Sequence, residues 1–406
     1  MTRTMRIAAV LAAALAACDS APRNAVTSCQ QTTLVPTKTD ILFVIDDSGS
    51  MEVEQQKLGL TTSFNAFITR LATSPARSDF QIGVTTTSVD WPIFDAGTSG
   101  PITVFGRNPN DAAATPYPAG ALVAVDPTTP GKILYDAATQ RFTGTRILDA
   151  SSPTLVADFN ANAKVGTDGA GKEQGFRAAK LALTDRIADG TNAGFLRPGA
   201  RLAIVIVTDE DDCSDPATPP AVVYGRVGGG IQERCHSDAD QALLPKVSDY
   251  LDFLGTPLAG EVRPVVVAVI AGVDAQKRPV TPSCNNAGYK AVRYKAFVDG
   301  LGAQALIDDV CLPDFSPTLE SIAGLIAQNV TLSQAPADVR LLQVAVVRRD
   351  GTTTPCTVAT SGGAAAADVV YSAPQAGRAP ALQFQAQGRC VLQQGDEVRL
   401  QILCAG

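Results

Sequence analysis

The strongest chemical signal in the sequence is a group of oxygen-bearing side chains at positions 46–50. The segment reads Asp-Asp-Ser-Gly-Ser and directly follows an apolar run at 41–45. One carboxylate and two hydroxyls, presented by a tight turn that contains glycine, are hard oxygen ligands of the kind that magnesium and calcium prefer. The candidate metal ligands are therefore Asp46, Ser48 and Ser50. Serine and aspartate are also favoured N-caps, so an ordinary turn between a strand and a helix is the alternative interpretation.

This segment and its setting resemble the D-x-S-x-S signature of the von Willebrand factor A (VWA) family, over roughly residues 38–333. The resemblance implies a doubly wound α/β domain. Its metal ion-dependent adhesion site (MIDAS) lies where loops leave the carboxyl ends of the strands, as ligand sites in open sheets do. Two further family positions are matched by Thr167, which precedes a helix, and by Asp209, which follows a strand. The loop between Thr167 and its helix is longer than in the family pattern.

The predicted site leaves part of the coordination of the metal open. These few oxygens leave one or more positions for water or for a carboxylate that a partner brings. The sequence therefore predicts a MIDAS-type adhesion module that binds Mg²⁺ or Ca²⁺ and holds a protein ligand through an acidic residue. Two alternatives stay open: an envelope structural protein whose metal only stabilises the fold, and a secreted hydrolase.

The stretch after Asp209 is more acidic than a metal-dependent adhesion site requires. Its residues Asp211, Asp212 and Asp215 are candidates for a second site that holds calcium. The alternative is a solvated acidic loop, closed by a disulfide, that influences the metal only through its field.

The sequence contains few of the residues and motifs that catalysis requires, and we expect that the protein is not an enzyme. Hydrolases with an activated nucleophile need a base, and His236 is the single histidine. We expect it to be exposed and structural, because no G-x-S-x-G elbow accompanies it. Segment 166–172 lacks the phosphate-loop pattern because Glu173 follows Lys172, which argues against a nucleotide. A net charge of -7 without a basic stripe argues against nucleic acid.

The start of the sequence indicates the compartment. Arg3 and Arg6 precede an apolar run that is too short to span a bilayer, as in a signal peptide. The segment Leu-Ala-Ala-Cys, ending at Cys18, resembles the lipobox of bacterial lipoproteins, whose cysteine becomes the acylated first residue. Residues 1–18 are therefore the predicted signal peptide and lipobox, and 19–37 a tether. We expect an exported chain, lipid-anchored to the cell membrane or to the outer membrane; an ordinary signal peptide is the alternative.

Cysteine usage agrees with export, because removal of Cys18 leaves an even set of eight. An even set in an exported chain indicates disulfides, whose pairing the sequence does not fix. Proximity along the chain favours Cys213 with Cys235 and Cys284 with Cys311. The spacing argues against zinc, since no C-x-x-C pair occurs. The remaining candidates are Cys29, Cys356, Cys390 and Cys404.

The elements that must position these residues alternate between strands and helices. Apolar runs predict strands at 41–45, 80–85, 201–208, 262–271 and 303–308, and apolar spacing predicts helices at 52–71, 172–187, 240–254, 289–301 and 317–330. Such alternation favours an α/β fold with a doubly wound, mostly parallel sheet covered by helices on both faces. We expect a domain at 38–333 with a long surface loop insertion at about 88–146, and a small all-β appendage at 336–406.

Overall fold

The computed structural model describes most of the chain after residue 26. The described residues are 27–35, 38–73, 79–91, 103–104, 117–217, 221, 225–227, 230–232, 235–284, 288–332, 334–360, 367–374, 380–385, 387–393 and 395–404. The predictions for Cys18 and for the signal peptide fall outside this set. So do the side chains of Cys29 and Cys404, although the backbones of both lie in strands.

A six-stranded sheet forms the centre of the larger part of the molecule. Its order is β13-β12-β9-β2-β3-β8, and all neighbours are parallel except the edge strand β8. The bounds are β2 (Lys38–Ile45), β3 (Asp79–Thr86), β8 (Ile147–Asp149), β9 (Arg201–Val207), β12 (Val265–Ala271) and β13 (Ala305–Asp309). The five predicted strands of this part are therefore present, and β8 is an addition.

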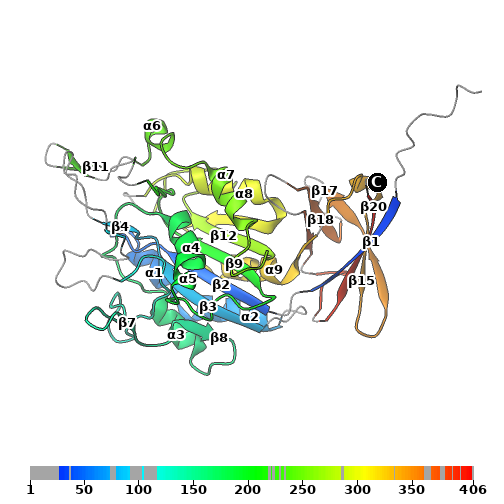
Figure 1. Cartoon of the computed structure of the whole chain (residues 1–406), viewed down its shortest axis with the longest axis horizontal. Helices are drawn as coiled ribbons and strands as arrows, with labels where there is room; N and C mark the ends of the chain where they lie inside the picture. The colour runs from blue at the N-terminus through cyan, green and yellow to red at the C-terminus, as the bar shows by residue number, and fades with distance from the viewer. Residues whose placement is uncertain are drawn as a thin grey trace, which may run out of the picture.

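Helices cover both faces of this sheet (Figure 1). Alternate residues of β2 point to opposite faces. Phe43 packs into one hydrophobic core and Val44 into the other. The first core is covered by α1 (Glu52–Leu58), α2 (Thr61–Thr73), α3 (Leu155–Asn162) and α9 (Ser316–Gln328), the second by α4 (Gly175–Leu183), α5 (Asp185–Ala188), α7 (Val247–Leu254) and α8 (Val292–Leu301). The predicted fold class is confirmed.

Three predicted helices are divided in two. The helix expected at 52–71 breaks between α1 and α2, where Gly59 ends α1. A Cβ atom on Gly59 would meet Asn160 O at 3.1 Å and Gln55 O at 3.2 Å, so a glycine fits this close approach. The helix expected at 172–187 divides into α4 and α5, and the helix expected at 240–254 into the short α6 (Asp238–Gln241) and α7.

The insertion at 88–146 is not a surface loop throughout, and that prediction is wrong for 117–125. Most side chains of this segment are fully buried, Tyr117 and Leu122 among them. Val123 N donates to Val84 O at 2.8 Å, so the segment runs against β3. Flanking prolines and polar residues dominate the composition of the insertion, yet its apolar run at 121–125 is part of the core. The described parts also hold short hairpins, β4 (Asp90–Trp91) with β5 (Thr103–Val104) and β6 (Tyr135–Asp136) with β7 (Arg141–Phe142).

The smaller part of the molecule is a β-sandwich of two four-stranded sheets. One has the order β1-β20-β15-β16 and the other β14-β19-β18-β17. Both contribute side chains to a third core, which also includes Ala327 of α9. The bounds are β1 (Thr27–Leu34), β14 (Asn329–Thr331), β15 (Gln343–Val347), β16 (Thr353–Cys356), β17 (Val358–Thr360), β18 (Val369–Ser372), β19 (Ala381–Phe384) and β20 (Glu397–Cys404). The sandwich and the α/β part therefore share α9.

Strand β1 lies within the segment 19–37 that was predicted to be a tether. Residues 27–34 pair with β20 in antiparallel register, from Thr27 opposite Cys404 to Leu34 opposite Glu397. The blue β1 lies beside the red β20 in Figure 1. The sequence of β1 contains β-branched threonines but no apolar alternation, so its partner at the far end of the chain decides its structure. The tether prediction is wrong for 27–34.

Three disulfides join described residues. The two local pairs that the sequence favoured are present, Cys213–Cys235 with a Cα–Cα distance of 5.5 Å and Cys284–Cys311 with 5.3 Å. The third, Cys356–Cys390, lies in the sandwich. Disulfides of this kind are typical of exported proteins. Among the helices of the described part, none combines the length and the apolar character needed to cross a bilayer.

Candidate metal site

The candidate residues lie at the point where the winding of the sheet reverses. From β2 the chain continues to β3 on one side, whereas β9 and β12 lie on the other side. Asp46 follows β2 and Asp209 follows β9, and Asp46 N donates to Val207 O at 2.9 Å. The carboxyl ends of two adjacent parallel strands thus bring both aspartates to one edge. Open α/β sheets bind ligands at such a switch point.

The turn after β2 gathers its oxygens by short contacts. Asp46 Oδ1 accepts a hydrogen bond from Ser48 N at 2.8 Å. Ser48 Oγ lies 3.1 Å from Ser50 Oγ, and Ser50 Oγ donates to Asp209 Oδ1 at 3.2 Å. The structure therefore brings together four of the five residues of the expected set.

Two hydroxyls that the sequence analysis did not single out also contact Asp46. Thr208 Oγ1 donates to Asp46 Oδ2 at 2.7 Å, and Thr87 Oγ1 lies 3.5 Å from Asp46 Oδ1. Asp46 and Asp209 are fully buried, whereas Ser50 is half-buried and Gly49 is exposed. The oxygens are thus enclosed by protein on the strand side and open to solvent at the turn.

Burial raises the pKa of both carboxyls. The pKa of Asp46 lies above its usual range because the charged form is desolvated, although bonds from Thr208 and Ser48 oppose the shift. Burial, followed by the negative charges of Asp46 and Glu54, raises the pKa of Asp209 to about 7, against the bond from Ser50. Buried carboxylates that repel one another are stabilised by a nearby cation. Their donor set of carboxylate and hydroxyl oxygens fits Mg²⁺ or Ca²⁺.

Thr167 stands in a loop beside the turn. It is half-buried, and its carbonyl oxygen lies 4.0 Å from the place that a Cβ atom on Gly49 would occupy. Its neighbour Asp168 is exposed. The loop that carries Thr167 therefore adjoins the turn that carries the other hydroxyls.

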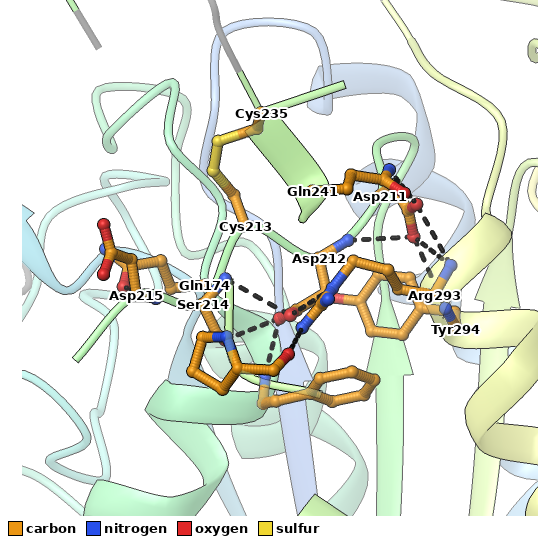
Figure 2. Close-up of polar contacts among 12 residues, drawn as sticks. Gln174, Asp211, Asp212, Cys213, Ser214, Asp215, Cys235, Gln241, Arg293 and Tyr294 are labelled. Atoms are coloured by element: carbon orange, nitrogen blue, oxygen red, sulfur yellow. Dashed lines mark hydrogen bonds and ion pairs between the residues drawn. A yellow bond between two sulfur atoms is a disulfide. The ribbon is translucent and has the colours of Figure 1, made fainter. Parts of the chain in front are cut away.

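The acidic run after Asp209 has a different role in the structure. Asp211 accepts hydrogen bonds from Arg293 N and Tyr294 N at the start of α8, and from Gln241 Nε2 (Figure 2). Asp212 accepts from Phe176 N at the start of α4, at 3.0 Å, and pairs with Arg293 Nε at 3.2 Å. Negative charge stabilises a helix N-terminus, so these two aspartates fix α4 and α8 to the end of β9.

Asp215 likewise meets protein donors. It forms a buried ion pair with Lys172, whose Nζ lies 3.2 Å from Asp215 Oδ2. Within the described residues, no group of three or more His, Cys, Asp or Glu side chains is arranged to share a metal ion. The second calcium site at Asp211, Asp212 and Asp215 stays a prediction. The three side chains are buried and bonded to protein donors, so the acidic run is not the solvated loop of the alternative, although the Cys213–Cys235 disulfide is present.

His236 is not exposed, contrary to expectation. Its ring stacks on Tyr289 with centroids 3.6 Å apart, and its Nε2 lies 3.3 Å from Glu210 Oε2. Burial lowers the pKa of His236 to about 4, so the ring is neutral at physiological pH. Its environment is that of a packed side chain next to the Cys213–Cys235 disulfide.

Comparison with known proteins adds little to this geometry. No family model matches the sequence, and no curated protein matches it. Similar solved structures include proximal thread matrix protein 1 from the mussel byssus (10% identity, 75% of this chain, TM-score 0.33). Others are the pilus adhesin SpaC from Lactobacillus rhamnosus GG (11%, 93%, 0.31) and the manganese-loaded TRAP protein of Plasmodium vivax (11%, 82%, 0.28). The chain covers 51%, 40% and 97% of these three chains, and such low TM-scores support no argument about function.

Proposed function

We propose that this chain is a metal-dependent protein-binding module of the VWA type on the bacterial envelope. The observation that carries the proposal is the continuous set of oxygens from Asp46 through Ser48 and Ser50 to Asp209, at the switch point of the sheet. Two buried carboxyls with raised pKa values lie in this set. A divalent cation would offset their charges.

The residues have separate tasks in this proposal. Asp46 and Asp209 supply negative charge, and Ser48, Ser50 and Thr167 supply neutral hydroxyl oxygens. When bound, Mg²⁺ or Ca²⁺ supplies a positive centre with coordination positions that the protein leaves open. The exposed Gly49 gives a partner access from solvent. An acidic side chain of a protein ligand is the group that fits such a centre best.

The direction of β2 supports an outward-facing site. β1 ends at Leu34 and β2 begins at Lys38, so β2 starts next to the sandwich and carries the chain away from it. Eight strand residues span about 26 Å. In Figure 1 the sandwich lies at one end of the molecule and α1, which follows the site, lies toward the other. We also propose that Cys18 is a lipid anchor; the sandwich then lies nearer the membrane and the site faces away from it.

A peptide screen tests the proposed function. The full mature chain, with Cys18→Ser to prevent acylation, is applied to an array of peptides in pairs that differ only by glutamate or glutamine. We expect binders in Mg²⁺ that carry glutamate, and their loss with a chelator or with Asp46→Ala. Binding that survives both treatments would overturn the proposal. Stabilisation by Mg²⁺ without any glutamate-dependent binding would instead favour the structural role of the metal.

A further inference from the structure

We infer that Gln55 and Ser88 are positioning residues that fix Thr167 against the metal-binding turn. The inference rests on the proposed function, because it gives both side chains a task at the same site. Neither residue belongs to the D-x-S-x-S pattern. Their contacts fasten the loop of Thr167 on both of its sides.

Gln55 fastens the loop immediately before Thr167. Its side chain, on α1, is buried, and its Nε2 donates to Asp46 O at 2.8 Å and to Gly166 O at 2.7 Å. Its Oε1 accepts from Gly166 N at 3.0 Å. A glutamine amide has two donor hydrogens and an acceptor oxygen, and all of them are used here. One side chain therefore links the backbone of Asp46, the first metal-ligand candidate, to Gly166, the residue that precedes Thr167.

The backbone conformation of Gly166 allows this contact. Its φ of +92° lies in the left-handed region, which glycine adopts without strain. The backbone is also closely packed, since a Cβ atom on Gly131 would lie 3.0 Å from Gly166 Cα. Gln55 bonds both the N–H and the C=O of Gly166, as the backbone of a neighbouring strand would do.

Ser88 fastens the loop after Thr167. Its hydroxyl donates to Asp47 Oδ1 at 2.7 Å and accepts from Ala170 N at 2.7 Å. Gly169 N also donates to Asp47 O at 2.7 Å. A Cβ atom on Gly169 would lie 2.3 Å from Asp47 Cγ, so only glycine allows this approach.

Two residues, Thr167 and Asp168, remain between the fastened positions. This segment is too short to move along the turn by one residue without breaking the bonds of Gly166 or those of Gly169 and Ala170. Metal sites need ligands held to within about 0.5 Å, and this support comes from the surrounding hydrogen bonds. These bonds can therefore hold Thr167 in one position, although the loop between Thr167 and α4 is longer than in the VWA family pattern.

A double-mutant cycle with Mg²⁺ tests the inference in the full mature chain. The variants are Gln55→Met, Thr167→Val and their combination, with Gln56→Met as the matched control on the same helix, because Gln56 is exposed. Loss of a supporting contact weakens metal binding by about 10- to 100-fold. We expect such a loss in each single variant, none in Gln56→Met, and a clearly smaller loss from Gln55→Met in the Thr167→Val background than in wild type, because Gln55 acts mainly through Thr167 and in part through Asp46.

Hydrogen exchange of the metal-free proteins provides an independent readout. The Gly166 amide should exchange faster in Gln55→Met than in wild type and Gln56→Met. If Gln55→Met fails to fold, the same cycle is run with Ser88→Ala, with Ala170 as the reporting amide. Wild-type affinity in the folded Gln55 and Ser88 variants, or losses that multiply with Thr167→Val, would overturn the inference. Absence of Mg²⁺ binding by the wild type would refute the proposed function instead.

Discussion

Two groups of carboxylates lie near the carboxyl end of β9, Asp46 with Asp209 and Asp212 with Asp215, and they differ in the donors that contact them. Asp46 accepts bonds from Ser48 N and Thr208 Oγ1, and Asp209 accepts a bond from Ser50 Oγ; these three donors are neutral. Asp212 and Asp215 pair with the cations Arg293 and Lys172. In the proposed function a bound cation offsets the charge of the first group, whereas cationic side chains of the protein pair with the second.

The comparison shows why acidic residues alone do not identify a metal site. A buried charge is costly unless a partner offsets it. For Asp212 the partner is Arg293 together with the N-terminus of α4, and the result is a junction between β9 and two helices. For Asp209 the neighbouring charges are themselves negative, and its pKa rises to about 7. The neighbours of a carboxylate, and not its place in an acidic run, determine its role.

The largest effect is expected where the internal pairing is broken. Asp212→Ala leaves Arg293 buried without its carboxylate and removes the acceptor of Phe176 N, so the free energy of unfolding should fall by about 3–5 kcal/mol. The Mg²⁺ affinity of the folded protein should not change. Urea unfolding measures the stability and Mg²⁺ titration the affinity. Asp189→Ala is the control, because Asp189 is exposed and its ion pair with Arg186 should contribute at most about 1 kcal/mol. Loss of Mg²⁺ binding by folded Asp212→Ala would show that Asp212 belongs to the metal site and not to a separate structural group.

The second effect concerns the dependence of stability on pH. Metal-free Asp209 keeps its proton up to about pH 7, whereas the unfolded chain loses it near 3.8. The unfolded state thus binds fewer protons in this interval, and stability falls as the pH rises from about 4 through 7. Asp209→Asn removes this penalty and should stabilise the metal-free protein by about 2–4 kcal/mol at about pH 8.

Urea unfolding in a chelator, at about pH 5 and about pH 8, checks this sign. The gain from Asp209→Asn should be smaller at the lower pH, and Mg²⁺ binding should be lost in the variant. An equal change in stability at both pH values would show that Asp209 carries no buried charge in the metal-free protein.

The smallest effects come from two serines that bond to one aspartate each. Ser214 Oγ donates to Asp212 at 2.6 Å, and Ser50 Oγ donates to Asp209 at 3.2 Å. Ser214→Ala should lower the free energy of unfolding by about 1–3 kcal/mol and leave Mg²⁺ affinity unchanged. Ser50→Ala should weaken Mg²⁺ binding by about tenfold or more with a smaller change in stability. If Ser50→Ala and Ser214→Ala changed the Mg²⁺ affinity equally, the carboxylates of Asp209 and Asp212 would not have the different roles described above.

Much of the fold could be predicted because its signals are local. Strands such as β2 and β12 are continuous apolar runs, since parallel strands covered on both faces bury every side chain. β1 gave no such signal, because its pairing with β20 joins the two ends of the chain. The buried run at 121–125 was obscured by the prolines and polar residues around it.

The candidate site was also predicted only where its signals are local. The five expected ligands are predicted from a pattern in the sequence and from their places after a strand or before a helix. Gln55, Ser88 and Thr208 could not be singled out, because their significance lies in bonds between distant residues. Gln55 and Gly166 are 111 residues apart, and Arg293 and Asp212 are 81 apart. No spacing rule along one chain contains such pairs.

Calorimetric titration of Mg²⁺ and Ca²⁺ into the full mature chain is the first test of the proposed metal site. Wild type is compared with Asp46→Ala, and circular dichroism verifies that both are folded. We expect one binding site in the wild type and its loss in Asp46→Ala. A folded wild type that binds neither ion, or unchanged binding by Asp46→Ala, would contradict it.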